Sequence, residues 1–294
     1  MPNSVPVVDI NTNSLFLFFF LFLYFQIMFL SVCSSVNFMS LTVKMKIIII
    51  ALCVTIAAAA IATPTTIVLL NKNSPIHLNL LENAGVMIEA KGVRIYIDPI
   101  NLPDNYSGLP ADAILITHEH GDHYQSTMIT MLETDKTKIV FPEVMDVYIS
   151  LFDGIGVLPG DEFNVRSIKI SCFYMYTIAP EGYESSHPRE SNYTSYIIDI
   201  DGFTIFHAGD SYNIEEYTQL KGLIDVAMLP LGPGCQTMTG IDVVHVIDII
   251  EPSYFIPIHY AEGADISFIN DFGTAVENTG CEIIHLSYFE SYYF

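Results

Sequence analysis

Hydrophobic and polar positions divide the chain into an apolar beginning and a longer part in which short apolar runs alternate with turn residues. Two pairs of segments with alternating apolar and polar residues predict β-hairpins: 86–90 with 93–97, and 195–200 with 203–207. In each pair the two segments are joined by two residues, the second of which is glycine, as in a hairpin turn. Short and nearly continuous apolar runs predict buried strands at residues 113–116, 138–142, 168–174, 226–230, 254–259 and 281–288.

Helical spacing is clear in only one segment of the longer part. Apolar residues recur on one face over residues 243–250, after a cap at Thr239 or Asp242, and Pro252 ends this helix. A short helix is also predicted to run as far as Met131. Because strands outnumber helices and no repeat interrupts them, the pattern predicts an α/β sandwich whose chemistry lies in loops at one edge of the sheets.

The apolar beginning contains two long runs without a charge, residues 15–32 and 47–70. The first run has the minimum length that spans a bilayer as a helix. The second follows Lys44 and Lys46 and contains a small-residue cleavage site at residues 60–62. A basic start, an apolar core and such a site are typical of a secretory signal peptide.

Two interpretations of this region stay open. In one, Met45 is the initiator, residues 1–44 are a mis-annotated upstream segment, and residues 45–70 are a signal peptide or membrane anchor. In the other, the two runs are membrane helices. Both interpretations place residues 71–294 outside the cytoplasm, secreted or anchored to the membrane, because basic residues before the second run stay inside.

Composition narrows the class of substrate and the kind of site. The chain is 51% hydrophobic and carries a net charge of −22, and its mean hydropathy of +0.42 owes most to the apolar beginning. So negative a surface repels phosphate backbones, which excludes nucleic acid and leaves a small-molecule substrate. The five cysteines form no C-x-x-C pair, so a disulfide framework and a thiolate zinc site are excluded. Each is interpreted as a buried, inert residue: Cys33, Cys53, Cys172, Cys235 and Cys281.

Candidate chemistry is concentrated in the sequence His-Glu-His-Gly-Asp-His, directly after a predicted buried strand. His118 and His120 flank one residue of an extended segment, so both rings point the same way and can share a cation. Asp122 and His123 follow and face a second cation. Imidazole and carboxylate are ligands suited to Zn²⁺, Mn²⁺ or Fe²⁺, so this segment predicts a metal site.

Three further segments extend this motif: His-Ala-Gly-Asp-Ser ending at Ser211, Pro-Ile-His-Tyr ending at Tyr260, and Ser-Ser-His-Pro ending at Pro188. Together they resemble the metallo-β-lactamase superfamily over residues 76–288. The chain is most similar to a branch of small metal-dependent hydrolases that includes the ascorbate-phosphate lactonases. The resemblance implies a four-layer αββα sandwich (the metallo-β-lactamase fold), preceded here by the N-terminal signal or anchor segment. It also implies hydrolysis of a small ester, lactone or phosphodiester by a water that two metal ions activate.

The resemblance also implies a ligand set and roles. One metal would be held by His118, His120 and His187, the other by Asp122, His123 and His259, with Asp210 bridging both. Zinc is the expected metal, with manganese and iron as alternatives. The catalytic candidates are Asp122, Asp210, which would orient the nucleophile, and His123, which shares with water the role of proton donor. Substrate loops are expected around Asp98, Glu119, residues 232–234 and Met238.

Two alternatives from other classes stay open. The first is an iron-binding redox protein on the same scaffold, but its flavodiiron branch has glutamate at the position of His120, so this histidine favours hydrolysis. The second is a non-catalytic envelope protein stabilised by metal. A structural zinc site is normally closed by four protein ligands, whereas the predicted set leaves coordination positions open.

Overall fold

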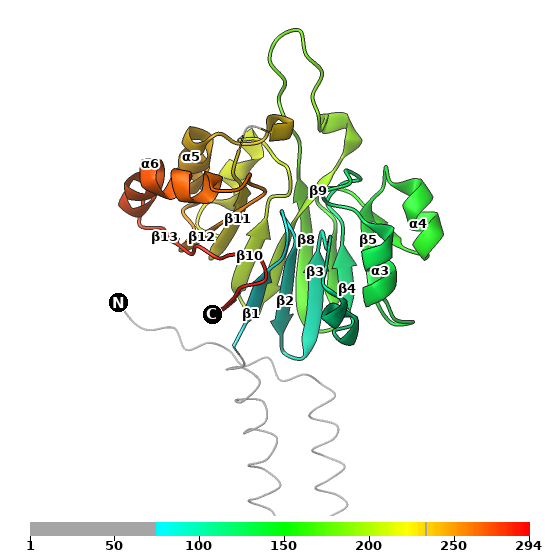
Figure 1. Ribbon diagram of the computed structural model, residues 1–294. Helices are drawn as coiled ribbons and strands as arrows, with labels where there is room; N and C mark the ends of the chain where they lie inside the picture. The colour runs from blue at the N-terminus through cyan, green and yellow to red at the C-terminus, as the bar shows by residue number, and fades with distance from the viewer. Residues whose placement is uncertain (1–74, 233) are drawn as a thin grey trace, which may run out of the picture. The chain divides into compact units, whose positions relative to one another are not determined.

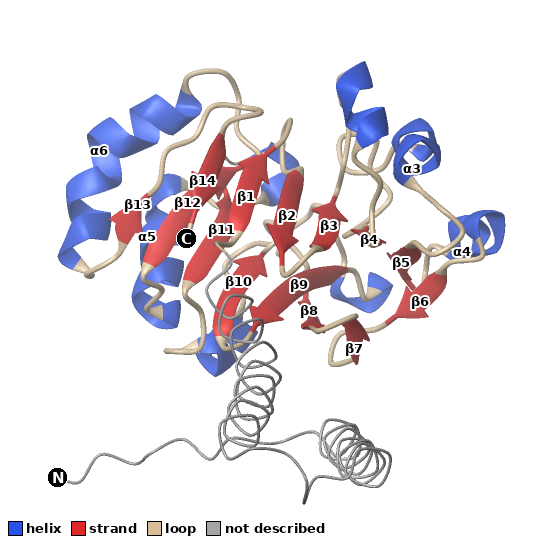
Figure 2. Cartoon of the chain, turned by 90° about the horizontal axis from the view of Figure 1, so that it is seen from below, coloured by secondary structure: helices blue, strands red, loops and turns tan. Residues whose placement is uncertain are grey.

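Two seven-stranded sheets form the centre of the fold (Figure 2). The computed structural model describes residues 75–232 and 234–294. In the first sheet the order is β14 (Ser291–Tyr293), β1 (His77–Leu80), β2 (Val86–Ala90), β3 (Val93–Ile97), β4 (Ala113–Leu115), β5 (Lys138–Pro142) and β6 (Ile155–Val157). In the second sheet it is β13 (Glu282–Ile283), β12 (Tyr254–Ile258), β11 (Val226–Pro230), β10 (Phe203–His207), β9 (Thr194–Ile200), β8 (Ile168–Tyr174) and β7 (Glu162–Val165).

Both predicted hairpins are confirmed by their turns. Lys91 and Gly92 join β2 to β3 with φ values of 55° and 72°, and Asp201 and Gly202 join β9 to β10 with φ values of 55° and 92°. Two successive positive φ values give a turn whose twist matches that of the strands, and glycine adopts the second without a steric cost.

The sheets pack face to face, and helices cover their outer faces (Figure 1). Buried residues from both sheets, among them Ile95 and Ile198, form the central core. The helices are α3 (Ser126–Leu132), α4 (Asp146–Phe152), α5 (Gly240–Ile250) and α6 (Ala264–Asn278), with short 3₁₀ turns η2 (Asp104–Gly108), η3 (Arg189–Ser191), η4 (Glu215–Leu220) and η5 (Gly234–Gln236). The elements α3 and α4 pack on the first sheet, and η4, α5 and α6 pack on the second. This arrangement agrees with the predicted α/β sandwich.

Strand direction brings several loops to one edge of the sandwich. In the first sheet β3, β4, β5 and β6 are parallel, and in the second β10, β11 and β12 are parallel. Parallel neighbours end at the same edge, so the loops after β4, β10 and β12 lie together. We call this the site edge, and the edge where these strands begin the opposite edge.

The predicted helix over residues 243–250 is confirmed as α5, and its cap is resolved. The Thr239 side chain accepts a hydrogen bond from the Asp242 backbone N–H, and the Asp242 carboxylate accepts one from the Thr239 backbone N–H. Thr239 is therefore the N-cap of a reciprocal capping box. The short helix also exists, as α3.

Several elements were not predicted: α4, α6, β6, β7 and β14. The apolar spacing of α6 is carried by Phe268, Phe272 and Val276, and the polar residues and Gly273 between them mask it. The predicted strand over residues 281–288 is wrong beyond Ile283, because only Glu282 and Ile283 pair with β12. The aromatic end of the chain pairs with β1 instead, a contact that local periodicity does not indicate.

The predicted signal, anchor or membrane segments at residues 1–70 lie outside the described residues. Within residues 75–232 and 234–294, no helix combines the length and apolar character needed to cross a membrane. Cys172 and Cys281 are buried as predicted. Cys235 is exposed, because the short turn that carries it lies on the surface, so the prediction of a buried thiol was wrong there.

Candidate metal centre

The seven predicted ligands come from four loops at the site edge. The segment with His118, His120, Asp122 and His123 follows β4 directly, and Asp210 follows β10 after two residues. His259 is the first residue after β12, and His187 lies in the long connection between β8 and β9.

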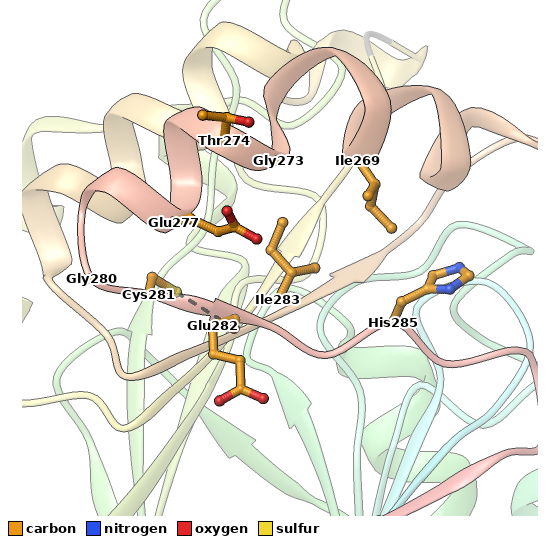
Figure 3. Close-up of a pocket in the computed structure, with 9 residues that line it drawn as sticks. All are labelled: Ile269, Gly273, Thr274, Glu277, Gly280, Cys281, Glu282, Ile283 and His285. Carbon is orange, nitrogen blue, oxygen red and sulfur yellow. Dashed lines mark hydrogen bonds between the residues drawn. The ribbon is translucent and has the colours of Figure 1, made fainter.

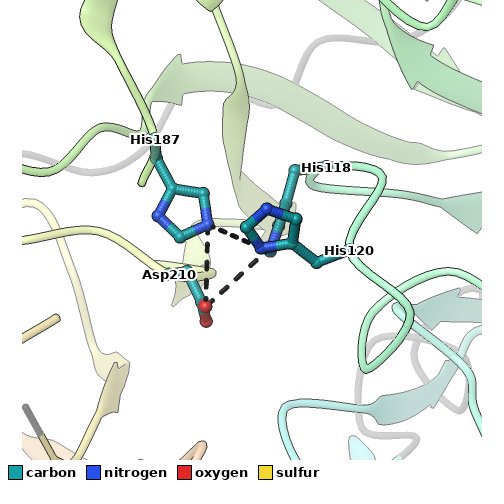
Figure 4. A group of neighbouring side chains, drawn as sticks. All are labelled: His118, His120, His187 and Asp210. Carbon is teal, nitrogen blue, oxygen red and sulfur yellow. Dashed lines mark hydrogen bonds and ion pairs between the residues drawn. The ribbon is translucent and has the colours of Figure 1, made fainter. Parts of the chain in front are cut away.

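The side chains of these residues converge into two groups. In each group one ligand atom per residue lies within 4.8 Å of the others, and the groups are His118, His120, His187 and Asp210, and Asp122, His123 and His259. Figure 4 shows the first group, in which dashed lines join His118 and His187 to the Asp210 carboxylate and His187 to His120. The division into two groups is the one that the sequence predicted for two cations.

Asp210 stands between the groups. Its Oδ1 lies 3.0 Å from His123 Nε2, and its Oδ2 lies 3.2 Å from His259 Nε2. The same Oδ2 lies 3.8 Å from His187 Nε2 and 3.9 Å from His118 Nε2. A single buried carboxylate therefore faces nitrogen atoms of both groups.

Several atoms of the cluster are buried and lack a hydrogen-bond partner among the described residues. They are both carboxylate oxygens of Asp210 and the Nε2 atoms of His118 and His123. A buried polar atom without a partner costs about 1–3 kcal/mol, so such a concentration is unfavourable unless something else satisfies the atoms. Imidazole nitrogen and carboxylate oxygen are donors that divalent zinc-like cations accept, so the residues fit a metal pair.

Asp98 orients residues of the cluster through hydrogen bonds. It is fully buried, and its Oδ2 accepts hydrogen bonds from His123 Nδ1 at 2.8 Å and Thr117 Oγ1 at 2.6 Å. Its Oδ1 accepts a third from the Thr117 backbone N–H. Because Nδ1 of His123 carries the proton, the Nε2 lone pair faces the cluster, the arrangement that a carboxylate imposes on a metal-binding histidine.

Thr117 fixes the neighbouring ring in the same way. Its hydroxyl proton goes to Asp98, so its oxygen accepts from His118 Nδ1, 2.9 Å away. His118 Nε2 is thereby left as a lone pair directed at the cluster. Asp98 thus orients one ring of each ligand group, one of them directly and the other through Thr117.

Of the residues predicted to lie in substrate loops, some are buried in the core and others are exposed. Asp98 and Met238 are fully buried, so their prediction as substrate-loop residues was wrong. Glu119 is exposed, and its carboxylate accepts a hydrogen bond from the Tyr193 hydroxyl at 2.6 Å. His207 is structural: its Nε2 donates to the Ala84 carbonyl oxygen at 2.7 Å.

Burial and charge shift the pKa values of the cluster in opposite directions. Burial, together with the neighbouring histidines, lowers the pKa of His118, and burial lowers the pKa of His187 to about 4. Burial also disfavours the imidazolium of His123, but the Asp210 and Asp98 carboxylates outweigh it and raise its pKa. For Asp210, burial opposes ionisation, and the surrounding imidazoles nevertheless lower its pKa.

Gly209 places Asp210, and no other residue fits there. Its φ is +55°, and an added Cβ would lie 2.6 Å from Met175 Sδ and 3.1 Å from Thr117 Cβ. We therefore expect Gly209→Ala to lower the free energy of unfolding by about 1–3 kcal/mol from overpacking, in addition to backbone strain. Chemical denaturation measures the loss. Gly202→Ala is the control, because its φ of +92° adds strain while its Cβ meets open space; an equal loss in both variants would contradict the overpacking.

A separate hollow of about 530 Å³ lies between α6 and the chain around β13 (Figure 3). Ile269 and Ile283 line it together with Glu277 and His285. It includes none of the seven candidate ligands, so we assign the chemistry to the site edge and not to this hollow.

Comparisons with known proteins identify the family of the chain. A family model described as the beta-lactamase superfamily domain matches residues 77–259. A UPF0173 protein of Pyrococcus abyssi is 30% identical over 183 residues, which are 60% of this chain and 80% of that protein. A UPF0173 metal-dependent hydrolase of Pyrococcus horikoshii is 30% identical over 209 residues, 65% of this chain and 88% of the relative.

Solved structures share the fold. A Parabacteroides distasonis protein assigned as a metal-dependent hydrolase is 28% identical, with a TM-score of 0.65, over 74% of this chain and 96% of the other. Igni18, a metallo hydrolase from Ignicoccus hospitalis, has a TM-score of 0.61 at 23% identity, over 75% of this chain and 99% of the other.

Proposed function

We propose, because the chain belongs to the metallo-β-lactamase superfamily, that it is a metal-dependent hydrolase of a small-molecule substrate. The observation that carries the proposal is the convergence of unpartnered, buried imidazole and carboxylate atoms around Asp210. The Pyrococcus horikoshii and Parabacteroides distasonis relatives, both described as metal-dependent hydrolases, support it.

In this proposal two divalent cations, zinc first among them, occupy the two ligand groups. His118, His120 and His187 would hold one cation, and Asp122, His123 and His259 would hold the other, with Asp210 shared between them. When bound, such a pair would lower the pKa of a water to about 7 and would polarise the oxygen of the scissile group. Because Asp210 would be shared, neither metal position has four protein ligands of its own. Coordination positions therefore stay open for water and substrate.

The chain's own residues orient the reaction. Asp210 is fully buried and lies between the two groups, where it would orient the attacking water. His123 has Nδ1 bonded to Asp98 and Nε2 directed at Asp210, so we propose that it acts as a ligand and transfers no proton. Asp122 has a half-exposed side chain, 3.3 Å from His259 Nε2, and is the cluster carboxylate that substrate can approach.

Esters, lactones and phosphodiesters all suit this chemistry, and the lactonase branch stays a prediction. The test is a panel of generic esters, lactones and phosphodiesters assayed with purified protein, before and after chelation. We expect chelation to remove more than about 99% of turnover, since the metal supplies the nucleophile, and Zn²⁺ to restore it. Mass spectrometry should count two metals per chain before chelation.

Other outcomes would redirect the proposal. Full turnover by protein from which all metal has been removed would contradict metal-dependent hydrolysis. Two irons with a visible absorption band, and no hydrolysis, would favour the redox alternative on the same scaffold.

A further inference from the structure

With one exception, the cationic side chains of the described residues lie away from the candidate metal centre. The described residues contain eight lysines and arginines: Lys91, Arg94, Lys136, Lys138, Arg166, Lys169, Arg189 and Lys221. The metal centre lies at the site edge, after the ends of β4, β10 and β12. Strand direction therefore decides how far each cation lies from it.

In the first sheet the cations lie at the opposite edge. Lys91 is in the turn before β3, and Arg94 is the second residue of β3, which is parallel to β4. Lys138 begins β5, also parallel to β4, and Lys136 precedes it. Each of these positions is at the start of a strand whose end reaches the site edge.

In the second sheet the same rule holds for three more cations. Arg166 lies in the turn before β8 and Lys169 near its start, whereas the end of β8 leads to the loop of His187. Lys221 precedes β11, which is parallel to β10 and β12. Seven of the eight cations of the described part thus lie at the opposite edge.

Ion pairs hold most of these cations in place. Their contacts with carboxylates of the same edge are Lys91–Asp201 at 2.7 Å, Arg94–Glu89 at 2.6 Å, Arg166–Asp112 at 2.7 Å, Lys169–Glu162 at 2.7 Å and Lys221–Glu251 at 2.8 Å. Even these long side chains, held in ion pairs near the starts of the strands, do not reach a ligand at the other end of strands of this length.

Arg189 is the exception, and its charge is already matched. It lies in η3, two residues after His187, and its guanidinium pairs with the buried Glu216 and lies 5.1 Å from the centroid of the Tyr176 ring. Glu215 is a further carboxylate, 3.8 Å away. Arg189 therefore connects the His187 loop to η4 by an ion pair. Because the neighbouring carboxylates match its charge, little net positive charge is left to bind a ligand.

Exposed carboxylates lie in the same loops as the candidate ligands instead. Glu119 lies between two of the candidate ligands, and Asp122 is itself half-exposed. Glu184 is exposed three residues before His187, and Glu262 is exposed three residues after His259. Beyond the metal pair, whose own positive charge Asp122 and Asp210 partly offset, a substrate at the site edge therefore meets carboxylates and no unpaired lysine or arginine of the described residues.

On the premise of the proposed hydrolase function, we infer that the substrate carries no anionic group outside its scissile bond and is uncharged or cationic there. The metal pair itself can bind the oxygen of the scissile group, whether that oxygen is neutral or negatively charged. A second carboxylate or phosphate would have to lie among Glu119, Glu184 and Glu262 without a free cation to bind it. Like charges brought together in this way oppose both encounter and binding.

Three 4-nitrophenyl esters of matched chain length test this inference on the full-length, zinc-loaded protein. Their acyl groups are pentanoate (neutral), glutarate as the monoester (anionic) and 4-(trimethylammonio)butanoate (cationic). At about 10 mM salt we expect kcat/KM for the cationic ester to exceed that for the anionic ester about tenfold or more, with the neutral ester between. The ratio should approach one near 1 M salt, where the Debye length falls to about 3 Å.

Charge-reversal variants locate the effect. Glu262→Lys should reduce the cationic-to-anionic ratio at low salt by about threefold, since it places a cation at the site edge. Asp135→Lys is the matched control, because Asp135 is exposed, adjoins Lys136 at the opposite edge and gives the same change of net charge. Its ratio should stay at the unmodified value.

Each other result has a definite meaning. A preference for the anionic ester, a ratio that does not change with salt, or equal effects of the two variants would overturn the inference while leaving hydrolysis intact. Absence of metal-dependent turnover with all three esters would instead contradict the proposed ester hydrolysis, and the inference with it.

Discussion

Asp210→Ala is expected to lose metal and hydrolytic activity together. The two oxygens of Asp210 lie 3.0 Å and 3.2 Å from His123 Nε2 and His259 Nε2, and the nitrogens of His118 and His187 are close by. Because no other carboxylate among the described residues faces both groups, alanine leaves the pair without its common ligand. We expect kcat/KM to fall by more than about 100-fold, beyond the loss typical of residues that only support a ligand.

Metal content and kcat/KM are to be measured on the same preparation of this variant. Asp201→Ala is the matched control, because Asp201 lies in the β9–β10 turn, pairs with Lys91 and has no contact with the cluster. The control should keep both metals and full turnover. An Asp210→Ala protein with unchanged metal content and turnover would show that the carboxylate does not bridge.

Asp98→Ala is expected to weaken metal binding without removing a ligand. Three donors lose their acceptor: His123 Nδ1, the Thr117 hydroxyl and the Thr117 backbone N–H. Both supported rings are then free to rotate, so metal affinity should fall about 10–100-fold. The free energy of unfolding should fall by about 1–3 kcal/mol for each buried donor that stays unsatisfied.

Asp225→Ala separates these two effects. Asp225 accepts from the Thr204 backbone N–H at 2.8 Å and the Thr204 hydroxyl at 3.1 Å, so it repeats the Asp98–Thr117 contacts at the opposite edge, without a histidine. We expect this variant to lose stability and keep its metal affinity, as measured by denaturation and competitive chelator titration. If both variants lowered metal affinity equally, Asp98 would be no more than a stabilising residue.

Much of the sheet structure could be predicted because its signals are local. The turns at Lys91-Gly92 and Asp201-Gly202 carry their own conformational preference, and buried strands such as β11 are continuous apolar runs. The missed elements depend on distant partners. The strand β14 exists because it pairs with β1, more than 200 residues earlier in the chain, and no local periodicity announces that contact.

The candidate site divides in the same way. Most of the side chains that converge there could be named from the sequence, because they stand in short motifs after apolar strands, and their role as metal ligands stays a prediction. Asp98 could not be assigned correctly, since its role depends on a contact with His123 that exists only once β3 and β4 lie side by side. The signal available was an acidic residue directly after an apolar strand, the same signal that identified the other loops.

The segregation of charge is also invisible in the sequence. Within the described residues, lysines and arginines are scattered from Lys91 to Lys221, and acids are dispersed among them. Only the strand directions show that the starts of strands carry the cations and the ends carry the metal centre. The net charge of the chain predicted that nucleic acid is not the substrate. The distribution of charge over the fold adds a proposed preference among small-molecule substrates.

The most direct test of the account is anomalous X-ray diffraction from crystals of the zinc-loaded protein, recorded at the zinc edge. We predict two peaks per chain, one in each ligand group, with His nitrogens about 2.0–2.1 Å from the metal and Asp210 oxygens in contact with both. Peaks elsewhere in the chain, or none near Asp210, would contradict the assignment of these seven residues as a dinuclear metal centre.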